Sequence, residues 1–168
     1  AITSEDLKRA DNYKIDKKRK VLEKKAIDYE QYLKSLEMSL EFKSFSEEDI
    51  SRISQLCNKS NQFNLTTKRY TEKDIEKIMT NKDFITLTLK LKDKFDDMGI
   101  IGLVICTVDQ DELEIDTWLM SCRVLKRDIE KATLNEIIKI SNKNKIKTII
   151  GKYYPTTKNN LLKNIIQV

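Results

Sequence analysis

The pattern of apolar and polar residues changes its period sharply between residues 113 and 140. Over Leu113–Leu119 the two kinds alternate, which is the period of a strand with one buried face. From Leu125 onward apolar residues recur at steps of three and four, which predicts a helix over Leu125–Ile140. The junction Ser121-Cys122-Arg123 would then join the end of a strand to the start of a helix. Because unpaired N–H groups and the helix dipole favour anions there, we expect an anion-binding site.

The first forty residues predict a long, charged helix. Thr3 and Asp6 have the spacing of a capping box, which marks a helix start. Apolar residues then recur at steps of four and three and form a narrow seam of Leu22, Ala26, Tyr29, Leu33 and Leu36. Such a seam suits packing against the same domain or a preceding one, and a coiled-coil dimer is the alternative.

The middle of the chain predicts short helices followed by strands joined by turns. Capping boxes at Ser46–Asp49 and Thr71–Asp74 each open a helix. Strands are predicted at Leu40–Phe45, Ile85–Leu91, Ile100–Val108 and Ile146–Ile150, a turn at Asp96–Gly99, and a last helix at Leu161–Ile166. Strands joined by turns pair antiparallel, and a strand that returns through a helix usually pairs parallel. We therefore expect a mixed α/β fold in which Ile100–Val108 and Leu113–Leu119 are antiparallel neighbours.

The stretch NQFNLTTKRY at residues 61–70 is polar and follows neither the helical nor the strand period. Asn and Thr are common turn residues, so this stretch could be only a capped connection between two helices. A loop this rich in side-chain donors could equally hold an oxyanion or a phosphate. Both interpretations remain open at the level of sequence.

Composition excludes several classes of site. The chain has 168 residues, enough for one domain, and its 32 basic and 27 acidic residues give a net charge of +5. The two signs are interleaved, as on a solvated surface, so we expect no nucleic-acid partner. Three widely spaced Cys and no His argue against a zinc site, exclude a Ser-His or Cys-His dyad within this chain, and suit a reducing cytoplasm. The apolar run Ile100–Val108 is about half of what a membrane span needs, so no membrane partner is expected.

Four stretches together resemble the carboxyl-terminal domain of FkbH-like proteins. They are NQFNLTTKRY at 61–70, LKDKFDDMG at 91–99, IDTWLMSCRVLKRDIE at 115–130 and YYPTTKN at 153–159. The resemblance covers nearly the whole chain, including the DLKRADNY start. Proteins of this family usually join a HAD-type phosphatase domain to a GNAT-like acyltransferase domain, and this chain resembles the second. The resemblance implies that residues 1–40 are a helical linker from a phosphatase domain missing here. Residues 41–168 would be the GNAT-like domain, a mainly antiparallel sheet flanked by helices, with truncation at the C-terminus left open.

The family is associated with loading a glyceryl unit from 1,3-bisphosphoglycerate onto the phosphopantetheine thiol of an acyl carrier protein. That is an early step towards methoxymalonyl-type extender units of polyketides. The resemblance implies two partners, the carrier protein and the phosphatase domain of the same polypeptide. It implies no cofactor in this domain, with the carrier's phosphopantetheine as acyl acceptor. The alternative function is a non-catalytic module that binds the carrier protein or the phosphatase domain, and an acetyl-CoA N-acetyltransferase is the third hypothesis.

The chain departs from the family at the phosphate loop. That loop is typically R/Q-x-x-G-x-G/A in GNAT proteins and RVLGRG in FkbH relatives, whereas this chain has Arg123-Val-Leu-Lys126-Arg127-Asp128. Losing both glycines places side chains, and with Asp128 a negative charge, where a pyrophosphate would approach. We therefore expect weak binding of acetyl-CoA, while Lys126 and Arg127 remain able to meet the phosphate of a carrier's phosphopantetheine.

The candidate nucleophile is Cys122. A helix amino terminus beside Arg123 would lower the pKa of its thiol and favour thioester formation, and a Cys that only fills the turn is the alternative. The candidate binding residues lie in the polar loop, the phosphate loop and the YYPTTKN stretch. They are Asn61, Asn64, Thr66, Thr67, Arg69, Arg123, Lys126, Arg127, Thr156, Lys158 and Asn159. No metal site is expected.

Overall fold

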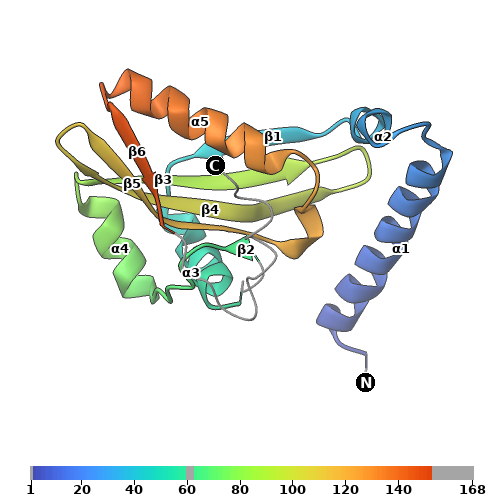
Figure 1. Ribbon diagram of the computed structural model, residues 1–168. Coiled ribbons are helices and arrows are strands. Elements are labelled where there is room, and N and C mark those ends of the chain that lie inside the picture. Colours follow the sequence, from blue (N-terminus) through green and yellow to red (C-terminus); the bar gives the residue numbers. More distant parts are fainter. Residues whose placement is uncertain (1, 60–62, 153–168) are drawn as a thin grey trace. The chain divides into compact units, whose positions relative to one another are not determined.

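The computed structural model describes residues 2–59 and 63–152 (Figure 1). In chain order the elements are α1 (Ser4–Lys25), α2 (Tyr29–Ser35), β1 (Ser39–Lys43), the 3-10 helix η1 (Glu47–Asp49), α3 (Ile50–Lys59), β2 (Phe63–Asn64), α4 (Glu72–Thr80), β3 (Phe84–Lys92), β4 (Asp97–Asp109), β5 (Glu112–Met120), the 3-10 helix η2 (Cys122–Val124), α5 (Ile129–Lys143) and β6 (Thr148–Gly151). The expected helix at Leu161–Ile166 lies outside the described residues.

Within the described residues the strands form one six-stranded sheet in the order β1-β3-β4-β5-β2, with β6 pairing β5. β4 and β5 are antiparallel neighbours joined by a tight turn, as the apolar pattern predicted. β2 also pairs β5 antiparallel, whereas β6, which returns through α5, pairs β5 parallel. Figure 1 shows α5 on one face of the sheet and α3 and α4 on the other. The expected fold class is therefore confirmed, including the long N-terminal helix.

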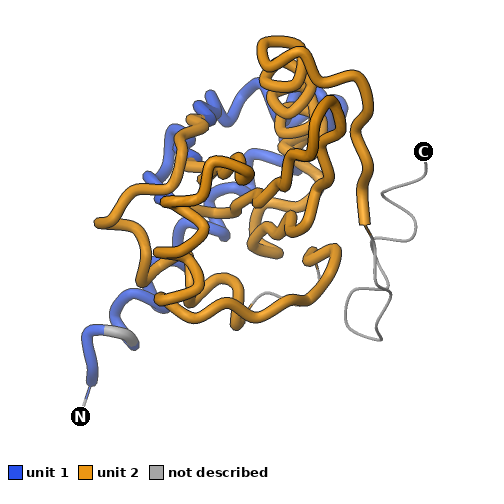
Figure 2. The backbone as a smooth tube through the Cα atoms, turned by 90° about the vertical axis from the view of Figure 1, so that its left-hand side faces the viewer, with its two compact units in different colours: residues 1–40, 91–99 blue, residues 41–90, 100–168 orange. Residues whose placement is uncertain are grey.

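The chain forms two compact units, coloured separately in Figure 2. Unit 1 contains residues 1–40 and 91–99, which are α1, α2 and the turn between β3 and β4 with the strand ends beside it. Unit 2 contains residues 41–90 and 100–168, and so holds α3, α4, α5 and most of the sheet.

The core of unit 2 lies between the α3–α4 pair and the sheet. Each helix turns an apolar face inward, and these residues meet apolar residues of β4 and β5: Ile53, Leu56, Cys57, Ile75, Ile78, Leu103, Ile105 and Leu119. α4 begins with the capping box predicted at Thr71 and Asp74. The box predicted at Ser46 does not form. The Ser46 hydroxyl instead donates to the Asp49 carboxylate at 2.9 Å, and the short helix η1 precedes α3.

The first forty residues form two helices, which corrects the expectation of one. The capping box at Thr3 and Asp6 is present, but α1 ends at Lys25 and α2 begins after Asp28. The Asp28 carboxylate accepts the Gln31 N–H at 2.7 Å, and the Gln31 side chain accepts the Ile27 N–H at 2.6 Å. This reciprocal pair satisfies N–H groups that a new helix leaves open, so the chain can turn here at low cost.

The predicted seam still packs, across that break. Leu22 and Ala26 contact a buried cluster of Tyr32, Leu33 and Leu36, together with Met38 and Phe95. Tyr29 leaves the seam: it is 44% exposed and its ring lies 5.7 Å from that of Tyr32. The seam is thus the core of unit 1, and of the two expected packing surfaces, the same domain or a preceding one, the structure shows contacts within this chain.

A buried ion pair fastens α1 to the turn between β3 and β4. The Arg19 guanidinium donates to both carboxylate oxygens of Asp93, at 2.7 and 3.2 Å, and both side chains are almost wholly buried. The same carboxylate accepts the N–H groups of Phe95 and Asp96 at 2.9 and 3.0 Å. The turn therefore lies at residues 93–96, and Gly99, which the sequence placed in it, lies in β4 with a φ of 66°.

We expect Arg19→Ala to lower the free energy of unfolding by about 3 kcal/mol, because it leaves a buried carboxylate without its counter-charge. Burial would raise the pKa of Asp93, but hydrogen bonds from Arg19 and the turn amides outweigh it and hold the pKa below its usual value. The stability from this pair is therefore present above about pH 4 and lost as pH falls further. Urea unfolding at neutral pH and near pH 3 tests this. The difference between parent and variant should shrink in acid, and the exposed neighbour change Lys18→Ala should cost less than about 0.5 kcal/mol at either pH.

Candidate functional site

β5 carries one extra residue in the middle of its pairing with β4. Ile105 lies opposite Thr117, while the next residue, Cys106, lies opposite Ile115, so Asp116 has no partner on β4. This β-bulge shifts the alternation of side chains by one position, which breaks the simple in-and-out pattern predicted for Leu113–Leu119. Asp116 and Trp118, which the sequence placed on the wet face, are 7% and 6% exposed. Bulges often re-aim a side chain next to a functional site.

The bulged carboxylate is the centre of a polar cluster. Lys68 forms an ion pair with one oxygen of Asp116, and the Tyr70 hydroxyl and the Thr117 hydroxyl both donate to the other, the latter at 2.9 Å. Burial would raise the pKa of Asp116, but these hydrogen bonds and the nearby Lys68 charge outweigh it, so the pKa is lowered. Burial and the hydrogen bond to Asp116 raise the pKa of Tyr70. At neutral pH the cluster therefore holds an ionised carboxylate beside a protonated phenol.

The segment 63–70 is bound along the edge of β5 by its own polar groups. Thr66 donates to the Asp116 carbonyl at 2.9 Å. The Leu65 N–H donates to the Trp118 carbonyl at 3.1 Å, and the Asn64 side chain accepts the Thr67 N–H at 2.9 Å. Arg69 donates to the Cys57 carbonyl on α3. Asn64, Thr66 and Arg69 thus have internal structural contacts, while Asn61 lies outside the described residues.

The loop between β5 and α5 differs from the expected helix start. α5 begins at Ile129, not Leu125, and η2 occupies Cys122–Val124. Cys122 is exposed but lies outside the first turn of α5, where a helix dipole acts, so the expected helix-terminal environment is absent. The reason is local. Lys126 and Asp128, which precede α5, both adopt left-handed conformations, and an α-helix cannot continue through them.

Those two left-handed residues stand where the resembled family has glycine. Lys126 has a φ of 64° and Asp128 a φ of 61°, a region that costs an L-residue roughly 1–2 kcal/mol and glycine very little. The loop therefore keeps a glycine-type backbone although both glycines are gone. Between them Arg127 is 8% exposed and donates to the Arg123 carbonyl at 3.2 Å, while Arg123 and Lys126 are exposed.

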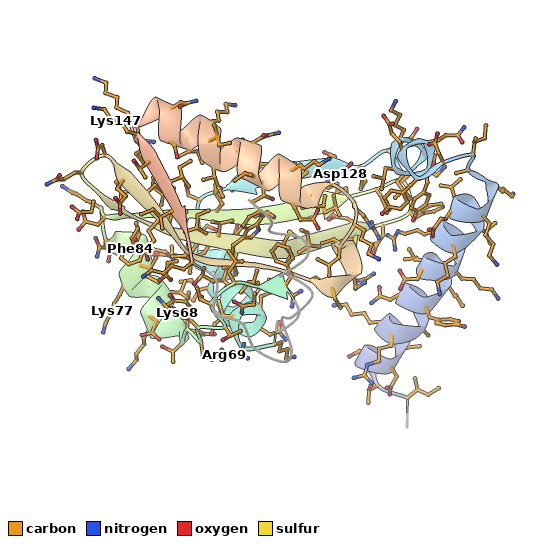
Figure 3. The ribbon with its side chains drawn as sticks, in the orientation of Figure 1. Lys68, Arg69, Lys77, Phe84, Asp128 and Lys147 are labelled. Atoms are coloured by element: carbon orange, nitrogen blue, oxygen red, sulfur yellow. The ribbon has the colours of Figure 1, made fainter. Side chains whose placement is uncertain are left out.

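The candidate binding residues do not converge on one point. Lys68 and Arg69 lie on the α3–α4 side of the sheet, and Asp128 lies at the start of α5 on the other side (Figure 3). The ring of Trp118 on β5 lies edge-on to that of Phe63 on β2, with 5.4 Å between the ring centroids. Trp118 Nε1 is buried and has no hydrogen-bond partner within the described residues. Thr156, Lys158 and Asn159 lie outside the described part of the chain.

The sequence pattern does not predict the Asp116 cluster. Alternation placed Asp116 in solvent, and Lys68, Tyr70 and Thr117 were not singled out as its partners. One signal was present: Trp118-Leu119-Met120 are three consecutive apolar residues, which is incompatible with a strand wet on one face. Nothing in the spacing identifies Lys68 and Tyr70 as partners of Asp116, because that contact spans almost fifty residues of chain.

No group of three or more His, Cys, Asp or Glu within residues 2–59 and 63–152 is arranged to hold a metal ion. Over the same ranges, no helix combines the length and the apolar composition needed to cross a bilayer.

Comparison with known proteins identifies the fold. No protein-family model and no curated protein matches the sequence. Among solved structures, the chain is similar to a GNAT family acetyltransferase from Staphylococcus aureus, with a TM-score of 0.52, 19% identity, and coverage of 70% of this chain and 88% of that one. It is similar to the PaiA N-acetyltransferase of Thermoplasma acidophilum, solved with coenzyme A, with a TM-score of 0.57, 17% identity, and coverage of 76% and 86%.

A third similar structure is the ribosomal-protein-S18-alanine N-acetyltransferase of Escherichia coli, with a TM-score of 0.52 and 14% identity over 66% of this chain. The match spans 64% of that enzyme's length. The class that these likenesses define is the GNAT-type acetyltransferase fold. Identities this low show the shared fold alone, so the reaction and substrate of this chain are matters for proposal.

We expect Asp116→Asn to lower the free energy of unfolding by about 2 kcal/mol, because the neutral amide weakens the bonds from Lys68, Tyr70 and Thr117. Tyr70→Phe should cost about 1 kcal/mol, and the double variant should cost less than the sum by at least about 0.5 kcal/mol, since both changes remove one bond. Urea unfolding of the four proteins measures the coupling. Tyr13→Phe, at a 73% exposed residue, is the control. Strictly additive losses would mean that the two side chains do not act as a unit.

Proposed function

We propose that this chain is an acyltransferase-like domain that helps transfer a glyceryl-type three-carbon unit to the phosphopantetheine thiol of an acyl carrier protein. The setting is the biosynthesis of polyketide extender units. One observation carries the proposal. The loop between β5 and α5 keeps two left-handed residues, Lys126 and Asp128, at the glycine positions of the resembled family's phosphate loop. A GNAT-type fold with that loop geometry favours an acyl transfer that uses a phosphate-bearing thiol carrier.

The spatial placement of the resembled stretches supports the proposal. NQFNLTTKRY and IDTWLMSCRV are about fifty residues apart in sequence, yet Phe63–Tyr70 lies along β5 and contacts it through main chain and side chains alike. The two stretches therefore form one structural element around Asp116. This continuity favours a common functional origin over a chance match of separate segments.

The loop residues fit the phosphate of a carrier better than the pyrophosphate of coenzyme A. The exposed Lys126 would meet a single phosphate, and the exposed Asp128 adds a negative charge. Arg127 is 8% exposed and donates to the Arg123 carbonyl, so its role is to support the loop. The bound phosphopantetheine would supply the acceptor thiol. An acetyl-CoA N-acetyltransferase is the weaker candidate for this reason.

Cys122 is the proposed nucleophile, on grounds that differ from those of the sequence. Burial raises the pKa of Cys57 to about 12 and that of Cys106 to about 12, so neither thiol ionises near neutral pH. Cys122 is exposed and is the cysteine that a substrate can reach. Its thiolate would attack the acyl phosphate carbon of 1,3-bisphosphoglycerate, forming a thioester and releasing inorganic phosphate. The carrier's thiolate would then attack this thioester, leaving the acyl group on the carrier and restoring the Cys122 thiolate.

A second candidate is a non-catalytic module that binds the carrier protein or the phosphatase domain. The position of Cys122 outside the first turn of α5 favours it, because that placement removes the expected activation of the thiol. In both cases we propose a cytoplasmic protein whose phosphatase partner domain removes the remaining phosphate by hydrolysis, with neither nucleic acid nor membrane as partner. Intact-mass measurement of the full-length protein after incubation with 1,3-bisphosphoglycerate separates the two: an adduct of one phosphoglyceryl group supports transfer, and its absence supports the module.

We expect acetyl-CoA to bind weakly, with a Kd above the micromolar range, because of the side chains at Lys126 and Asp128. Restoring both glycines, in Lys126→Gly/Asp128→Gly, should strengthen binding at least tenfold, since the backbone already has the glycine conformation. Calorimetric titration measures this. As a control on conformation, Asp128→Ala should be less stable than Asp128→Gly by about 1 kcal/mol. Micromolar binding by the parent chain would overturn the expectation.

We expect Cys122→Ala in the full-length protein to abolish acyl transfer to the carrier while leaving the fold intact. Cys122→Ser should also fail, because a hydroxyl lacks the thiolate population of Cys near neutral pH. Arg123→Ala should weaken transfer less, since it removes a neighbouring charge and keeps the nucleophile. The readout is the mass of the acylated carrier protein, with Cys57→Ala as a variant at a buried thiol that should still transfer. If Cys122→Ala transferred the acyl group at the parent rate, Cys122 would not be the nucleophile, and we would expect the nucleophile in another domain.

A further inference from the structure

The charges of α1 are interleaved in sequence but sorted on the helix. Arg19 is 3% exposed and marks the inward side of α1. At 3.6 residues per turn, the half of the helix turned away from Arg19 carries no acid between Ala10 and Lys25. Its charged residues are all lysines, and all are exposed: Lys14, Lys17, Lys18, Lys20, Lys24 and Lys25. We call this half the lysine face. Asp11, Asp16 and Glu23 lie on the other half.

Apolar side chains stand among these lysines. Tyr13 is 73% exposed and Val21 is 47% exposed, and both lie on the lysine face. Aromatic residues amid charge are typical of protein interfaces, where they supply buried contact area while the surrounding charges steer association. The two residues are separated by lysines and form no continuous apolar strip. A helix that lies in a lipid surface needs such a strip, so the arrangement favours a protein partner over a membrane.

The lysine face weakens the helix that carries it. Lys14 and Lys18, and likewise Lys20 and Lys24, are four residues apart, a spacing at which like charges repel on a helix. Contacts elsewhere hold α1 in place, namely the capping box at Thr3 and the Arg19–Asp93 ion pair. An anionic partner would be attracted to these lysines and would also reduce their mutual repulsion, and both effects favour binding.

We propose that the lysine face of α1 is the docking surface for the acidic surface of the acyl carrier protein. This proposal rests on the proposed function, which requires such a carrier, and adds where the carrier is held. Unit 1 then has a role of its own in recruitment, separate from the residues around Cys122 in unit 2.

The test compares two triple variants with the same net charge. Lys17→Gln/Lys20→Gln/Lys24→Gln neutralises the lysine face, and Lys73→Gln/Lys82→Gln/Lys139→Gln neutralises three exposed lysines of unit 2. Purified phosphopantetheinylated acyl carrier protein is titrated into each full chain at low salt and at roughly 0.3 M NaCl. We expect the first variant to bind about tenfold more weakly at low salt and the second to bind as the parent does, with the difference shrinking in high salt. Circular dichroism checks that α1 stays helical.

The outcomes separate this proposal from the proposed function. Weaker carrier binding by the first variant, with no acyl transfer by any protein, would sustain the docking surface and refute the transfer. Equal KM for the carrier in both variants, with transfer intact, would refute the docking surface and sustain the transfer. Binding of the parent to phosphatidylglycerol vesicles but not to the carrier would replace the proposed partner with a membrane surface. If both variants lost the same amount of carrier binding, the loss would be due to the lower net charge and not to the lysine face, and the proposal would be refuted.

Discussion

The structure depends on one buried carboxylate at a break in a β-ladder. Asp116 occupies the β-bulge of β5, where it has no partner residue on β4. A buried charge without partners would cost several kcal/mol, so this fold requires groups that bond to the Asp116 carboxylate. Besides the adjacent Thr117 hydroxyl, those groups are Lys68 and Tyr70. The segment that carries them pairs with β5 at β2 and is bonded to α3 through Arg69. The bonds to Asp116 thereby give a defined structure to residues 63–70, a polar segment with neither the helical nor the strand period.

The loop between β5 and α5 has a backbone conformation that suits glycine, although no glycine is present in it. Lys126 and Asp128 adopt the left-handed conformation without the freedom that glycine has, and the residues on either side of the loop, Val124 and Ile129, are buried. A substitution at such a position changes what the loop presents to a ligand more than it changes the path of the chain. The shift from bare backbone to charged side chains therefore bears on ligand choice within one fold.

Local signals in the sequence predicted much of the fold. The capping boxes at Thr3 and Thr71, the β4–β5 pair and the mixed sheet follow from short-range spacing and period, and the structure has all of them. Two of the failures involve features that spacing does not encode. The bulge at Asp116 is stabilised from almost fifty residues away, and the later start of α5 reflects two residues in an unusual conformation. The helix break at Asp28 could have been predicted, because Asp28 and Gln31 have the spacing of a helix cap. The apolar residues continue at helical spacing across this break, and that pattern predicts a single helix.

The unequal burial of the three cysteines makes the protein a convenient reporter of its own motions. Cys57 is fully buried in the core of unit 2 and Cys106 is 2% exposed, while Cys122 is open to solvent. A maleimide dye added to the native protein would therefore attach at a single position, the β5–α5 loop, without any engineered site. Slow labelling of the other two thiols would report how often the helices part from the sheet, because a buried thiol reacts only during such openings.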